Sequence, residues 1–97
     1  MKFILKKPAK ENIYTAIRKI GYYFLSKNKE EINCVRSLGT TGYPRFHIYL
    51  QTEGEDMIFN LHLDQKKPIY KGTAAHSGEY KGETVQKEAD RIKQILL

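Results

Sequence analysis

The sequence predicts a single α+β domain, residues 1–97, in which two amphipathic helices cover one face of a three-stranded antiparallel sheet. The predicted order of elements is α-β-β-β-α, and three observations support it. Apolar residues recur with helical spacing near each end of the chain, whereas apolar and polar residues alternate along two neighbouring segments between them. A length of 97 residues, with 40% hydrophobic and 29% charged residues, is also typical of one folded domain.

Two stretches of the chain have the apolar spacing of helices. The first follows Pro8, a residue favoured in the first turn of a helix, and its apolar face contains Ile13, Ala16, Ile17, Ile20 and Phe24. The second covers residues 83–97, and its apolar stripe contains Val85, Ala89, Ile92, Ile95 and Leu96. Residues 1–5, MKFIL, are a candidate for an additional short strand at the N-terminus.

Three stretches have the character of strands: residues 30–38, EEINCVRSL, residues 45–52, RFHIYLQT, and residues 56–64, DMIFNLHLD. The last two alternate apolar and polar residues and predict a hairpin. A two-residue turn at Gly54 and Glu55, or a four-residue loop from Glu53 to Asp56, gives the same register. Either one pairs apolar with apolar residues across the hairpin, which a three-residue loop would not do.

This register gathers the polar residues of the hairpin on the face away from the helices. The residues predicted to lie directly opposite each other are Arg45 and Asp64, His47 and His62, and Tyr49 and Asn60. We expect this face to be exposed to water, because the helices cover the other one. Two of the chain's three histidines lie on it, so it is the first candidate for a functional site. The candidate binding residues around the histidine pair are Arg45, Tyr49, Asn60 and Asp64. An ordinary polar surface is the alternative.

The segment 65–82, QKKPIYKGTAAHSGEYKG, has no apolar period and contains three glycines and one proline. It is predicted to be a loop, and a loop of this length in so small a domain is often functional. Its candidate binding residues are Lys66, Lys67, His76 and Glu79.

Composition restricts the partners of this chain. A net charge of +6, from 17 basic and 11 acidic residues, favours anionic partners such as nucleic acid. No apolar run approaches the roughly 18–20 residues of a membrane-spanning helix, and the start MKFILKKP has a shorter apolar core than a signal peptide. The single cysteine, Cys34, cannot form an internal disulfide. We therefore expect a cytoplasmic protein with no membrane partner.

Four short segments carry a resemblance to a known family. IRKIGYYF is similar to the end of its first helix, FHIYL to its histidine-bearing strand, FNLHLD to the returning strand, and KGETVQKEADRIKQIL to its last helix. On these segments the chain resembles the HicA-type (YcfA-like) toxins, small ribonucleases with a fold like that of double-stranded-RNA-binding domains. The resemblance implies RNA and an antitoxin-like protein as partners, and His47 as the catalytic histidine. The family's Gly-Ser-His triplet is replaced by GYPRFH, and residues 66–79 are an insertion.

The histidine pair supports a ribonuclease hypothesis that needs neither a metal nor another cofactor. His47 would take a proton from a ribose 2′-hydroxyl, and His62 would donate one to the leaving group. Arg45 or a lysine of the loop would stabilise charge on the phosphate, and Asp64 would orient a histidine ring.

Three other functions fit the same residues. A non-catalytic RNA-binding module needs only the basic surface and an aromatic side chain such as Tyr49, on which bases stack. A protein-interaction domain would use the open sheet face to bind its partner. A metal site would use His47, His62, Asp64 and, as a fourth ligand, His76, whose side chains are all common ligand types.

Overall fold

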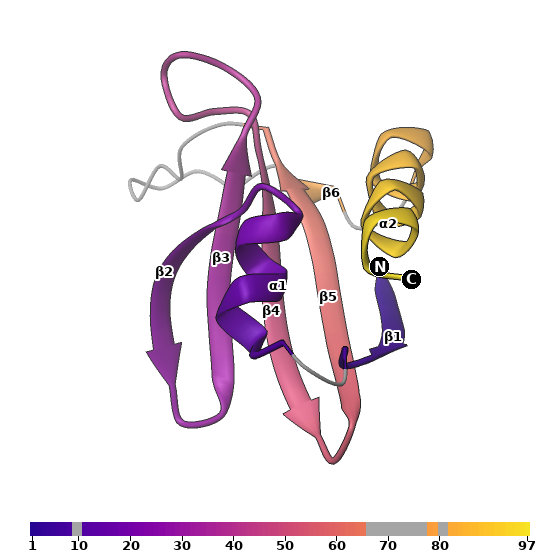
Figure 1. The fold of residues 1–97 in the computed structure, drawn as a ribbon. Coiled ribbons are helices and arrows are strands. Elements are labelled where there is room, and N and C mark those ends of the chain that lie inside the picture. Colours follow the sequence, from indigo (N-terminus) through magenta and orange to yellow (C-terminus); the bar gives the residue numbers. More distant parts are fainter. Residues whose placement is uncertain (9–10, 66–77, 80–81) are drawn as a thin grey trace.

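A computed structural model describes residues 1–8, 11–65, 78–79 and 82–97 of the chain and shows a twisted antiparallel sheet with two helices (Figure 1). The elements are β1 (Lys2–Lys6), α1 (Ile13–Lys19), β2 (Tyr23–Asn28), β3 (Glu31–Ser37), β4 (Arg45–Glu53), β5 (Asp56–Asp64), β6 (Gly78–Glu79) and α2 (Glu83–Leu96). The strand order is β1-β5-β4-β3-β2, and the two-residue strand β6 pairs with the end of β5, beyond β1. In the part of the chain that the structure describes, no helix is long and apolar enough to cross a membrane.

The prediction of a three-stranded sheet is wrong, although the protein is of the α+β class. The candidate strand at the N-terminus is confirmed as β1, which pairs with β5, and the sheet also contains β2, which was not predicted and pairs with β3. Phe24 follows Ile20 at a helical spacing and was therefore expected on the first helix. The helix instead ends at Lys19, with Ile20 as its C-cap, and Gly21 follows with a φ of +85°, a left-handed conformation that glycine adopts without strain. All six residues of β2, YFLSKN, are exposed. Because no face of this strand is buried, its sequence does not alternate between apolar and polar residues and did not indicate a strand.

The predicted β4–β5 hairpin register is confirmed. The strands are joined by a two-residue turn at Gly54 and Glu55, and Gly54 has a φ of +60°. The apolar pairs across the hairpin are Phe46 with Leu63, Ile48 with Leu61, and Leu50 with Phe59, and all six residues are buried. They form one face of the sheet, on which the core is built.

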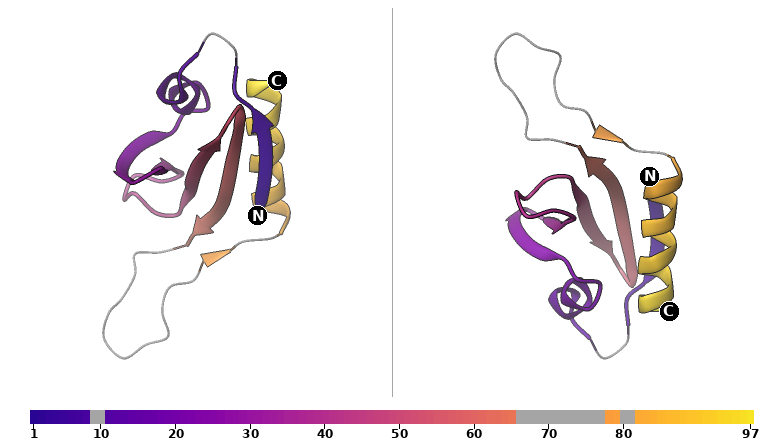
Figure 2. Two further views of the ribbon diagram at one scale, coloured as in Figure 1. Left: turned by 90° about the horizontal axis from the view of Figure 1, so that it is seen from below. Right: turned by 90° about the horizontal axis from the view of Figure 1, so that it is seen from above.

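Both helices contribute to this core. Ala16, Ile17 and Ile20 come from the first helix and its cap, and Val85, Ala89 and Ile92 come from α2. Figure 2 shows α2 lying along β1, while α1 lies beside β2 on the other flank of the sheet. Phe3 of β1 joins the same core by stacking on Phe59, with 4.8 Å between ring centroids.

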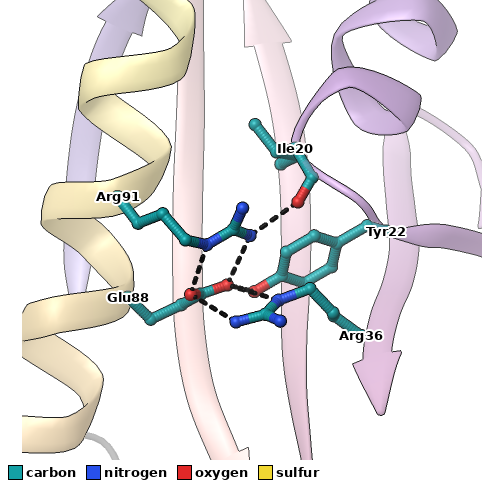
Figure 3. A network of polar contacts seen from close by, with 5 residues as sticks. All are labelled: Ile20, Tyr22, Arg36, Glu88 and Arg91. Atoms are coloured by element: carbon teal, nitrogen blue, oxygen red, sulfur yellow. Dashed lines mark hydrogen bonds and ion pairs between the residues drawn. The ribbon is translucent and has the colours of Figure 1, made fainter. Parts of the chain in front are cut away.

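A buried carboxylate connects the two helices to the sheet (Figure 3). Glu88 of α2 is buried and accepts hydrogen bonds from the Tyr22 hydroxyl at 2.6 Å, from Arg36 of β3 at 2.8 and 3.1 Å, and from Arg91 at 2.8 and 2.9 Å. Arg91 also donates to the carbonyl oxygen of Ile20, at the end of α1. Burial by itself raises the pKa of Glu88, but the hydrogen bonds from Arg91, Arg36 and Tyr22 outweigh it and lower the pKa to about 2.

Candidate metal centre

The sheet face opposite the core brings the predicted polar residues of the hairpin together. Arg45 lies opposite Asp64, His47 opposite His62, and Tyr49 opposite Asn60, as the alternation of the two strands predicts. All these residues belong to regular strands, so the backbone ladder positions their side chains.

The expectation that this face is open to water is wrong at the histidines. His47 is 9% exposed and His62 is 6% exposed. Val35 of β3, beside His47 on the same face, is buried too. The ring centroids of His47 and His62 are 4.8 Å apart, and those of His47 and Tyr49 are 4.4 Å apart. Aromatic packing thus forms a second, smaller buried cluster on this side of the sheet. We therefore expect substitution of His47 to lower the stability of the fold.

Asp64 lies at the centre of the cluster. Its Oδ1 atom is 3.0 Å from Nε2 of His62, and its Oδ2 atom is 3.6 Å from Nδ1 of His47. The same Oδ2 atom is 3.4 Å from Nε of Arg45. One ligand atom from each histidine and one from the carboxylate all lie within 4.8 Å of one another. Three groups that commonly bind transition metals therefore converge on one point.

Asn33 of β3 is part of the site and was not predicted from the sequence. Its side-chain oxygen lies 3.0 Å from Nε2 of His47. An amide oxygen can only accept a hydrogen bond, so this orientation of the Asn33 amide corresponds to the tautomer of His47 with its hydrogen on Nε2 and a lone pair on Nδ1. Nδ1 is the atom that faces Asp64. The signal in the sequence was an asparagine, a residue that is uncommon in strands, inside the strand-like run INCVR.

The charge state of His47 follows from its surroundings. Burial lowers its pKa most, and the neighbouring His62 and Arg45 lower it further, while Asp64 acts in the opposite direction; the result is a pKa of about 4. His47 is therefore neutral at pH 7. A neutral imidazole is the form that coordinates a metal and also the form that accepts a proton.

The remaining candidate residues lie around this cluster or outside the described part of the chain. Arg45 places its guanidinium over the ring of Tyr43, with 4.7 Å to the centroid, and Asn60 is half-buried opposite Tyr49. The backbone of Glu79, in β6, pairs with that of Leu63 in β5. The predicted binding residues Lys66, Lys67 and His76, and the side chain of Glu79, lie outside the described residues.

The arrangement suits metal coordination better than attack on a large substrate. A catalytic base must reach the proton that it removes, and His47 is almost completely covered. The ribonuclease hypothesis stays a prediction, without the open face on which it was based. No protein-family model matches the chain, and neither a curated protein nor a solved structure matches it significantly.

Proposed function

We propose that this protein binds a divalent transition-metal ion through Nδ1 of His47, Nε2 of His62 and the carboxylate of Asp64. The observation that carries the proposal is the convergence of these ligand atoms, all within 4.8 Å of one another, on two directly paired strands. Since the strands fix the three positions, only small side-chain movements are needed to close the site.

The distances suit the size of a metal ion. In a tetrahedral zinc site with ligands at about 2.0–2.1 Å, neighbouring ligand atoms lie roughly 3.3 Å apart. The separations of 3.0 Å between Asp64 Oδ1 and His62 Nε2 and of 3.6 Å between Asp64 Oδ2 and His47 Nδ1 lie on either side of this value. The three ligand atoms are spread over up to 4.8 Å, so the side chains would have to move closer together around an ion. A ligand set of two imidazoles and one carboxylate favours Zn²⁺, Fe²⁺, Co²⁺ or Ni²⁺ over Mg²⁺ and Ca²⁺, which prefer oxygen ligands.

The residues around the three ligands also support the proposal. Histidines that bind metals usually donate their other ring N–H to an oxygen, which fixes the tautomer and the orientation of the ring. Asn33 provides this oxygen for His47. Arg45 lies beside Asp64 in the position from which an outer group holds a carboxylate ligand.

The charge of the site predicts what else it holds. Two neutral imidazoles and one carboxylate leave a divalent ion with one positive charge, and Arg45 adds another. Three described protein ligands also leave a coordination position for a water molecule or a substrate, as in catalytic zinc sites. We expect this position to favour hydroxide or an anionic group.

Titration of metal-free protein with Zn²⁺ by calorimetry tests the proposal, together with Co²⁺, whose visible absorption reports the coordination geometry. We expect one ion per chain, and at least tenfold weaker binding in His62→Gln and in Asp64→Asn. Asp56→Asn is the matched control, because Asp56 is a second aspartate of β5 and pairs with Lys6 away from the site. Absence of binding at millimolar Zn²⁺, or equal loss in the control, would refute the metal site.

RNA binding is a second proposal, supported by the net charge of +6. It requires no access to the histidines and is compatible with a metal ion on this face.

A further inference from the structure

A second surface of the molecule, formed by β2 and its neighbour α1, has the properties of an interaction site. β2 is the last strand of the sheet order, and within the described residues it pairs only with β3. Its three consecutive apolar residues Tyr23, Phe24 and Leu25 are between 47% and 76% exposed. An edge strand with unpaired backbone groups and exposed apolar side chains is a template for another strand.

A hollow of about 400 Å³ lies next to this edge. Tyr14, Ile17 and Arg18 of α1 line it together with residues 21–24. The rings of Tyr14 and Phe24 are in edge-to-face contact, with 5.7 Å between centroids. An apolar side chain of a strand added beside β2 would therefore find an aromatic-lined hollow on the helix side of the sheet.

The charges of this surface indicate the partner. The one charged side chain that lines the hollow is Arg18, and the one charged residue of β2 is Lys27. Neither of these cations forms an ion pair with a described residue, whereas the neighbouring Lys19 is paired with Glu11. The turn after β2 adds one positive and one negative charge, on Lys29 and Glu30. Carboxylates on the partner would thus meet unpaired cations at both ends of the exposed apolar run.

We propose that β2 binds an extended segment of another protein by strand addition, in which an apolar residue and an acidic residue two positions apart point to the helix side of the sheet. One apolar side chain enters the hollow beside Phe24, and a carboxylate pairs with Arg18. A second copy of this chain suits the edge less well. Each copy carries a net charge of +6, and the irregular register between Phe24 and Ser26 adds a local twist that hinders pairing of two folded sheets.

Selection of a random library of twelve-residue peptides on immobilised protein tests this inference. We expect enriched peptides in which an apolar and an acidic residue lie two positions apart. A synthetic copy of the most enriched peptide should bind at least tenfold more weakly to Phe24→Asp and to Arg18→Glu. Ile4→Asp is the matched control, because Ile4 is an exposed apolar residue of the other edge strand, β1. The Ile4→Asp variant should bind the peptide as tightly as the wild type does. Circular dichroism verifies that each variant is folded.

Three results would overturn the inference. The first is a selection that enriches no peptides or enriches basic ones. The second is equal loss of binding in Ile4→Asp. The third is a dimer of the wild-type protein in sedimentation that Phe24→Asp dissociates, because the second copy would then be the occupant.

Discussion

At the scale of single residues, Asn33 determines which nitrogen of His47 is available. Its oxygen lies 3.0 Å from Nε2 of His47, and a hydrogen bond donated by Nε2 would leave Nδ1 as the ligand atom. Asn33→Ala removes this constraint, so we expect the affinity for Zn²⁺ to fall about 10–100-fold, as when outer groups of other metal sites are lost. Nitrogen NMR of the metal-free protein should show the Nε2–H tautomer in the wild type and a mixture in the variant. Unchanged affinity in Asn33→Ala would mean that Asn33 does not position His47.

His47 also makes a prediction about pH. Its pKa in the folded protein is about 4, below the value near 6.5 of an unfolded histidine. As the pH falls from 6.5 to 4, the unfolded chain takes up a proton at this residue and the folded protein does not. The free energy of unfolding should therefore fall with decreasing pH, by up to about 1.4 kcal/mol per pH unit in the middle of this window, in excess of other titrations.

Urea unfolding of metal-free wild type and His47→Gln between pH 4 and pH 8 measures this contribution. The wild type should lose more stability than the variant as the pH falls below 6.5, and the two curves should run parallel above pH 7. Parallel curves over the whole range would show that His47 is not buried as a neutral group.

At the scale of elements, Glu88 is the contact that holds α2 on the sheet and on the end of α1. Glu88→Ala leaves the Tyr22 hydroxyl buried without its acceptor and leaves Arg36 and Arg91 without their anion. We expect the free energy of unfolding to fall by about 2–4 kcal/mol. Glu83→Ala on the same helix removes only an exposed ion pair with Lys87 and should cost less than about 1 kcal/mol. Equal effects in chemical denaturation would show that the Glu88 cluster does not stabilise the fold.

The pairing of strands could be predicted only where the apolar pattern of both strands determines their register. The register of β4 and β5 was predictable, because a slip of one residue would turn Ile48 and Leu61 to the polar side. The pairing of Asn33 with Tyr49 was not, because β3 and β4 are joined by the irregular segment 38–44, which does not specify a register. The burial of His47 was not predictable either, because its contacts with Val35, Tyr49 and His62 come from neighbouring strands and from its own, and a polar residue in an alternating strand is normally exposed.

At the scale of the whole molecule, the net charge of +6 predicts salt-dependent binding to RNA. If the protein binds RNA, its affinity should fall steeply between about 50 and 200 mM salt, because each neutralised phosphate releases counterions. Gel shifts with a hairpin RNA and a single-stranded RNA at both salt concentrations measure this, and the same samples show whether the RNA is cleaved. No shift at the lower concentration would exclude RNA binding and the ribonuclease hypothesis together.

The partner of β1 in the sheet is far away along the chain, which affects the order in which the strands can pair during folding. The strands from β2 to β5 each pair with the next strand along the chain, so they can form as successive hairpins. β1 pairs with β5, and Phe3 lies opposite Phe59, more than fifty residues later. Closing so long a loop is entropically costly before any contact repays it. During synthesis β1 therefore leaves the ribosome long before β5 and is among the last of these strands to find its partner.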